Sequence, residues 1–270
     1  MKPTLLAVAL CLACCSGSRE GRIAQAEDIA RTGHLREHLN YADDFAILSF
    51  ERPGRGRILV VYIEGDGHAW VNPWQPAADP TPLDPVALRL AAQDPARPLL
   101  YLARPCQFVT APNCHYQLWT SHRLSPAVVK AFHQLIDDHR RRFHCDEVGL
   151  VGYSGGGALA TLIAEGRRDV AWLITVAANL DLGQWTRLHD LAPLSGSLDP
   201  VASADAIQEL PQVHFAGEND RVVPPAVIEG FLSTLPKTAP ARLVILPGFD
   251  HECCWATVWP KLIDLAELPR

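Results

Sequence analysis

The stretch Gly152-Tyr153-Ser154-Gly155-Gly156-Gly157 directly follows the apolar run Val148–Val151 and leads into a helical segment. A serine between glycines at a turn from strand to helix is the G-x-S-x-G pattern, in which the turn exposes the hydroxyl above a sheet. Glycine is needed on both sides because so sharp a turn brings other backbone close. The amide of Gly155, at the helix start, then points at whatever Ser154 attacks. The stretch therefore predicts a nucleophilic serine.

Two other interpretations of these glycines remain open. Gly155, Gly157 and Ala160 fit a relaxed dinucleotide-binding pattern, but the unit lies in mid-chain and its serine precedes the glycines. No acidic residue is clearly placed to bind a ribose, although Asp181 ends the next apolar run. The glycines could also form a turn without a function.

Apolar runs of strand length recur along the chain and alternate with helical patterns. Several are nearly continuous Val, Ile and Leu, which is typical of strands buried on both faces of a parallel sheet. The runs are Phe45–Phe50, Ile58–Ile63, Leu99–Leu102, Val148–Val151, Val170–Val176, Gln212–Phe215 and Arg242–Leu246. The turn at 53–56 predicts that the first two pair as an antiparallel hairpin. We predict one α/β domain, a mostly parallel twisted sheet with this N-terminal hairpin and helices on both faces.

Polar residues after two later strands complete a catalytic set. Asp220 follows the sixth apolar run, and His251 follows the last one in a glycine-containing turn. Ligands in such sheets bind beyond the C-terminal strand ends, so both side chains are expected to meet Ser154. A serine hydroxyl needs a base to remove its proton, imidazole does this near neutral pH, and a carboxylate orients the imidazole. Two rival candidates for the acid are Asp181 and Glu218.

The loop after Ile58–Ile63 is expected to supply an oxyanion hole. In this architecture one backbone N–H comes from that loop and the other from the residue after the nucleophile. We nominate the amides of Asp66 and Gly155, with Gly67 as an alternative; a glycine-rich turn without a function is the competing interpretation. Aromatic residues that could line a substrate pocket are Trp70, Tyr153, Trp119 and Trp185.

From about Phe45 to Leu265 the chain resembles an α/β-hydrolase serine hydrolase, because its G-x-S-x-G turn, Asp220 and His251 occur in that superfamily's order and context. The resemblance implies an α/β-hydrolase catalytic domain over 41–270 with a small lid at about 181–208. It implies cleavage of a carboxylic ester, as in carboxylesterases and lipases, through an acyl-serine intermediate without a cofactor. A thioester, or the amide of a peptide, is a less favoured substrate. One departure is Glu64-Gly65-Asp66-Gly67, which replaces the His-Gly type of oxyanion loop.

Two further functions use the same residues differently. The chain could be a non-catalytic binding protein of the cell envelope on a hydrolase scaffold, or an acyltransferase that excludes water better. A complete nucleophile, base and acid count against the first, because binding alone needs no such set. The expected partner is a small-molecule ester or acyl compound, and the sequence predicts no oligomeric state.

The first residues are typical of an export signal. Lys2 precedes the apolar run Leu5–Ala13, which is far shorter than the roughly 20 residues that span a bilayer. The cysteines at its exit resemble the lipobox of bacterial lipoproteins, and the chain is similar to exported bacterial lipoprotein hydrolases. This resemblance implies a signal peptide over 1–15 and a lipid anchor on Cys15 or Cys14. It also implies a membrane-attached place in the cell envelope or periplasm. Residues 16–40 are expected to form a tether.

Five cysteines follow the leader, so in an oxidising compartment at least one stays unpaired. Cys106 and Cys114 close a short loop and are the favoured disulfide. Cys253 could pair with Cys254, or one of the two could reach Cys145. After the leader the sequence has no C-x-x-C pair, so a zinc site is not favoured and no metal is expected.

Composition excludes several classes of protein. The 270 residues carry 24 Lys and Arg against 30 Asp and Glu, a net charge of −6 that gives no basic surface for nucleic acid. With 48% apolar and 20% charged residues, the chain is neither disordered nor a polytopic membrane protein.

Overall fold

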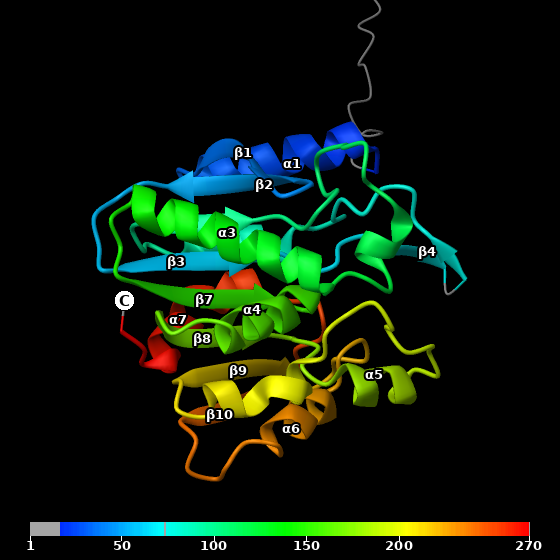
Figure 1. Ribbon diagram of the computed structural model, residues 1–270, viewed down its shortest axis with the longest axis vertical. Helices are drawn as coiled ribbons and strands as arrows, with labels where there is room; N and C mark the ends of the chain where they lie inside the picture. The colour runs from blue at the N-terminus through cyan, green and yellow to red at the C-terminus, as the bar shows by residue number, and fades with distance from the viewer. Residues whose placement is uncertain (1–16, 73, 270) are drawn as a thin grey trace, which may run out of the picture.

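An eight-stranded sheet forms the centre of the computed structural model, which describes residues 17–72 and 74–269 (Figure 1). Its strand order is β1-β2-β6-β3-β7-β8-β9-β10. The strands are β1 (Arg36–Ala42), β2 (Phe45–Arg52), β3 (Ile58–Ile63), β6 (Leu99–Leu102), β7 (Glu147–Tyr153), β8 (Val170–Val176), β9 (Gln212–Gly217) and β10 (Ala241–Leu246). The pairs β1–β2 and β2–β6 are antiparallel, and every pair from β6 to β10 is parallel. The short strands β4 (Trp70–Asn72) and β5 (Gln75–Pro76) form a separate hairpin.

Helices cover both faces of this sheet. On one face lie α1 (Arg19–Thr32), α2 (Val86–Gln93) and α7 (Trp255–Ala266); on the other lie α3 (Pro126–Arg142), α4 (Gly155–Glu165), α6 (Pro225–Leu232) and the 3₁₀ segment η3 (Pro200–Ile207). In Figure 1, α3 and α4 lie in front of the strands and α7 lies behind them. Alternating strand residues serve the two cores, because Leu59 and Val61 pack on one face and Val60 and Tyr62 on the other. The predicted α/β architecture is confirmed.

The antiparallel N-terminal hairpin exists, but its strands differ from those expected. β2 pairs with β1 and β6, while β3 runs parallel to β6 and β7, so the predicted pairing of Phe45–Phe50 with Ile58–Ile63 is wrong. β6 lies between β2 and β3. The sequence pattern does not predict the true partner, β1, because this is a largely exposed edge strand with polar residues instead of an apolar run.

The segment expected to be a tether folds onto the domain over its described residues. α1 and β1 occupy most of 17–40, and α1 buries Ala26 and Ala30. Its Arg22 donates to the carbonyl of Thr81 at 2.6 Å and pairs with Asp79 at 2.7 Å. Because this helix packs through alanines and an arginine, it has no apolar stripe that would identify it as a packed helix.

The predicted signal peptide, with Cys14 and Cys15, lies outside the described residues. Within the part of the chain that the structure describes, no helix combines the length and the apolar character needed to cross a membrane. The predicted disulfide between Cys106 and Cys114 is present, with Cα atoms 5.7 Å apart. Cys253 pairs with Cys254, and Cys145 is buried and free.

Candidate active site

Ser154 lies at the sharp turn between β7 and α4. Its backbone has φ 52° and ψ −124°, a left-handed conformation that is rare for a residue with a side chain. A Cβ on Gly152 would lie 2.3 Å from the carbonyl oxygen of Gly156, and one on Gly156 would lie 2.3 Å from that of Glu64. Glycine is therefore required at both positions, because the backbone of the turn and of the loop after β3 leave no room for a side chain.

Ser154, His251 and Asp220 form one hydrogen-bonded chain. The Nε2 atom of His251 lies 3.0 Å from Oγ of Ser154, and its Nδ1 lies 2.8 Å from Oδ2 of Asp220. If Nδ1 carries the proton and donates it to the carboxylate, Nε2 is free to accept from the serine hydroxyl. These distances are within the reach of proton transfer.

The carboxylate of Asp220 is fixed on its other side. Its Oδ1 accepts from the backbone N–H groups of Val222 and Val223 at 2.8 and 2.7 Å, and the residue is 3% exposed. The two rival acids are engaged elsewhere. Asp181 caps α5 (Leu182–Leu188) by accepting from the amide of Gln184, and Glu218 accepts from the amide of Gly248.

Two aromatic residues hold His251 in place. The hydroxyl of Tyr153 and the indole N–H of Trp255 both donate to the carbonyl oxygen of His251, at 3.1 and 2.9 Å. The Tyr153 ring also packs against the imidazole, with ring centres 5.3 Å apart. Burial raises the pKa of Tyr153 well above its ordinary value, so the hydroxyl stays a donor. The structure thus places Tyr153, a candidate pocket residue, in direct contact with the histidine.

The loop after β3 lies against the serine turn. A Cβ on Gly155 would lie 2.3 Å from both carboxylate oxygens of Asp66, so this loop and the first residue of α4 are in contact. The amide of Gly155 is one of the free N–H groups of a helix N-terminus. Neither this amide nor that of Asp66 takes part in the turn, loop and cap hydrogen bonds of the described residues. Both are available to bind a developing oxyanion. Gly67, the alternative donor, has φ +67° and turns the chain beside Pro80.

Glu64 and Gln107 hold this loop from beneath. Glu64 is 1% exposed, and its carboxylate accepts from the amide of Gly65 and the hydroxyl of Tyr101. It also accepts from two amides at the start of α2, which are those of Ala87 and Leu88. Burial raises the pKa of Glu64 to about 7. The side chain of Gln107 donates to the carbonyl of Gly65 at 2.9 Å.

Two arginines that sequence analysis missed bind the side chain of Asp66. Nη1 of Arg104 lies 3.2 Å from Oδ1, and Nη1 of Arg123 lies 2.7 Å from Oδ2. Arg104 also donates to the carbonyl of Arg123. Arg104 lies two residues after the end of strand β6, so the rule that identified Asp220 and His251 also applies to it. Arg123 follows no strand, and nothing in its local sequence marks it.

The remaining aromatic candidates lie in two places. Trp185, on α5 in the expected lid segment 181–208, stacks on the guanidinium of Arg123 at 5.1 Å. Its indole N–H donates to the carbonyl of Val222 at 2.7 Å, close to Asp220. Trp70 and Trp119 line a separate groove of about 590 Å³ beside the β4–β5 hairpin, and Ser154, Asp220 and His251 are not part of its lining.

Comparison with known proteins identifies the fold. No family model matches the sequence, and no curated protein matches it. Ser154 after β7, Asp220 after β9 and His251 after β10 occur in the chain order of the α/β-hydrolase triad, and solved structures of that fold superpose on the chain.

An α/β serine hydrolase homologue from Coxiella burnetii is 15% identical, with a TM-score of 0.60, 86% of this chain covered and 95% of the other. A bacterial membrane phospholipase A is 17% identical, with a TM-score of 0.59 and 92% of each chain covered. Est1E from Butyrivibrio proteoclasticus is 12% identical, with a TM-score of 0.60 and 85% and 98% covered. The chain therefore has the α/β-hydrolase fold.

Proposed function

We propose that this protein is a serine hydrolase that cleaves a carboxylic ester through an acyl-Ser154 intermediate. The hydrogen-bonded chain from Ser154 through His251 to Asp220 carries this proposal. Similarity to proteins described as a serine hydrolase homologue and a phospholipase A supports hydrolysis in general. An ester is favoured over an amide because an alcohol oxygen leaves more readily than an amine nitrogen.

The geometry supports the following reaction steps. His251 Nε2 takes the proton of Ser154 as Oγ attacks the carbonyl carbon, and the amides of Gly155 and Asp66 stabilise the oxyanion. Protonated His251 then gives this proton to the leaving oxygen as the carbon–oxygen bond breaks, which releases the alcohol. In the second half of the reaction His251 Nε2 takes a proton from water as the water oxygen attacks the acyl carbon. It then returns this proton to Ser154 Oγ as the bond between the acyl carbon and Oγ breaks, which releases the acid product. Asp220 remains ionised and orients the imidazole throughout.

Covalent labelling tests the nucleophile. A fluorophosphonate should add one adduct to the intact protein, and peptide mapping should place it on Ser154, whereas Ser154→Ala should stay unlabelled. Turnover of 4-nitrophenyl acetate by the wild type, but not by Ser154→Ala, would then distinguish an enzyme from a binding protein. Equal labelling of both proteins would remove Ser154 from the proposal.

We further propose that the protein is exported and anchored through a lipid on Cys15 or Cys14. The disulfide between Cys106 and Cys114 supports an oxidising compartment. Radioactive palmitate should label the full chain in growing bacteria, and Cys15→Ser or Cys14→Ser should abolish the label. If the label survives in both variants, neither cysteine is lipidated.

A further inference from the structure

A buried cluster of charged groups lies beside the nucleophile. It consists of Asp66, Arg104 and Arg123, whose side chains are 15%, 4% and 7% exposed. Two guanidinium groups, which stay protonated at neutral pH, share a single carboxylate. Glu64 is the other carboxylate that acts on Arg104, but its pKa of about 7 leaves it only partly ionised near neutral pH. The cluster therefore carries excess positive charge.

Both arginines keep buried N–H groups that the protein does not use. Among the described residues, Nη2 of Arg123 and Nε of Arg104 have no hydrogen-bond partner. A buried donor on a charged group without a partner is costly, and a buried charge without a counter-charge is more costly still. An anionic oxygen group that reaches the cluster would relieve both costs.

The position of Arg123 connects the cluster to the reaction. Its guanidinium lies between the carboxylate of Asp66, which touches Gly155, and the indole of Trp185, which is hydrogen-bonded beside the Asp220 loop. Arg123 thus lies between the oxyanion loop and the acid loop, at one side of Ser154. Trp185, which packs on Arg123, is only partly buried and so borders solvent.

We propose that Arg123, supported by Arg104, binds an anionic oxygen group, a carboxylate or a phosphate, on the substrate. This inference rests on the proposed function and names the class of ester that the site accepts. Arginine suits the role because its planar group offers several N–H donors, of which Asp66 occupies only part. The ester bond would lie over Ser154 with the anion directed toward Trp185.

Three fluorophosphonates with chains of equal length test the proposal. One ends in a carboxylate, one in the matching methyl ester and one in a phosphate, and second-order rates of labelling are measured by intact mass. The wild type should label at least about tenfold faster with a charged probe than with the methyl ester, as expected for a charge-assisted hydrogen bond. The faster of the two charged probes identifies the anion.

Variants test whether Arg123 itself, and not the overall charge of the protein, causes the faster labelling by charged probes. Arg123→Met should reduce the ratio of charged to neutral rates to about one, and Arg123→Lys should give an intermediate ratio because it keeps the charge without the planar donors. Arg140→Met, distant from Ser154, is the matched control and should keep the full ratio. Thermal melting verifies folding, and Arg123→Lys carries the test if Arg123→Met does not fold.

Two outcomes would overturn this inference while leaving the proposed function intact. They are equal rates for charged and neutral probes in the wild type, and a ratio that survives the loss of the Arg123 guanidinium. Failure of all three probes to label Ser154 would instead overturn the proposed function, and this inference with it.

Discussion

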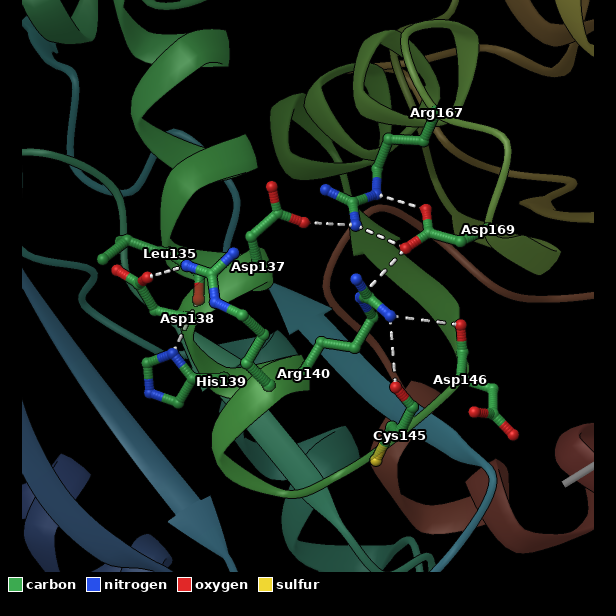
Figure 2. Close-up of polar contacts among 10 residues, drawn as sticks. Leu135, Asp137, Asp138, His139, Arg140, Cys145, Asp146, Arg167 and Asp169 are labelled. Carbon is green, nitrogen blue, oxygen red and sulfur yellow. Dashed lines mark hydrogen bonds and ion pairs between the residues drawn. The ribbon is translucent and has the colours of Figure 1, made fainter.

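Two arginine–aspartate clusters lie at opposite ends of the parallel strands, and their charges are balanced differently. At the end where β7 and β8 begin, Arg167 pairs with Asp137 and Asp169 at 2.7 Å each, and Arg140 lies 3.1 Å from Asp169 (Figure 2). Arg140 also donates to the carbonyls of Cys145 and Asp146. Although burial acts in the opposite direction, hydrogen bonds from Arg167 hold the pKa of Asp169 below its ordinary value.

The cluster at the other end has the same residue types and a different balance. Two arginines share Asp66, all three side chains are largely buried, and two N–H groups have no partner within the described residues. A balanced, partly exposed network is typical of a structural brace. An unbalanced and buried one is costly to maintain, which indicates a binding role. Within the described residues Nε of Arg140 in the first cluster also has no hydrogen-bond partner, so the ratio of charges, and not the count of partners, distinguishes the two clusters.

The largest effect should come from the acid beside the unbalanced cluster. Asp220→Asn should lower kcat/KM for 4-nitrophenyl acetate by about 10⁴-fold, because the amide favours the wrong imidazole tautomer. Asp181→Asn is the matched control and should leave activity unchanged, because Asn also caps helices well. Loss of activity in the Asp181 variant alone would move the acid to the loop after β8.

Removal of the single shared carboxylate should cost considerable stability. In Asp66→Asn two buried guanidinium groups lose their counter-charge, so the free energy of unfolding should fall by about 3 kcal/mol. Urea titration followed by circular dichroism measures this change. A fall well below about 1 kcal/mol would mean that solvent already screens the cluster.

Glu64, beneath the same loop, should make stability depend on pH. Its folded-state pKa of about 7 exceeds its ordinary value of 4.5, so the folded protein holds the proton more tightly than the unfolded chain. The free energy of unfolding therefore falls as pH rises from about 4.5 to about 7, by about 3 kcal/mol for this group. Glu64→Gln removes this contribution, while other titrating groups are common to both proteins. Urea titrations of both proteins across this pH range should show that their difference in free energy of unfolding changes with pH. A difference that stays constant would contradict the raised pKa of Glu64.

The sequence predicted the sheet, the serine turn and the residues that meet it, because each follows from local pattern. A nearly continuous apolar run marks a buried strand, and a polar residue in the loop that follows it marks the ligand-binding edge, as for Asp220 and His251. The edge strand β1 and the helix α1 have no such pattern, because each gains its burial only from neighbours in the fold. The insertion of β6 between β2 and β3 is a long-range pairing that no local signal contains.

The contacts within the cluster of Asp66, Arg104 and Arg123 could not be predicted from local sequence pattern. The sequence points to Asp66 only through its backbone amide, and it predicts no partner for the Asp66 carboxylate. Arg104 could have been found as a polar residue after a strand, but Arg123 is brought to Asp66 only by the path of the loop between β6 and α3. Whether such charges are balanced is a property of three-dimensional contact, so sequence alone gives no access to it.

The smallest effect is expected in the balanced cluster. Asp137→Asn removes one partner of Arg167, but Arg167 keeps two hydrogen bonds to Asp169, at 2.8 and 2.7 Å. Since the Asp137 side chain is 39% exposed, water replaces much of what is lost, and the free energy of unfolding should fall by less than about 1 kcal/mol. High salt should reduce the stability difference between the wild type and Asp137→Asn further, because it screens exposed charges. The same urea titration as for Asp66→Asn gives a direct comparison. If the two variants lose equal stability, the charge imbalance beside Ser154 has no energetic consequence, and its proposed link to an anionic substrate loses its physical basis.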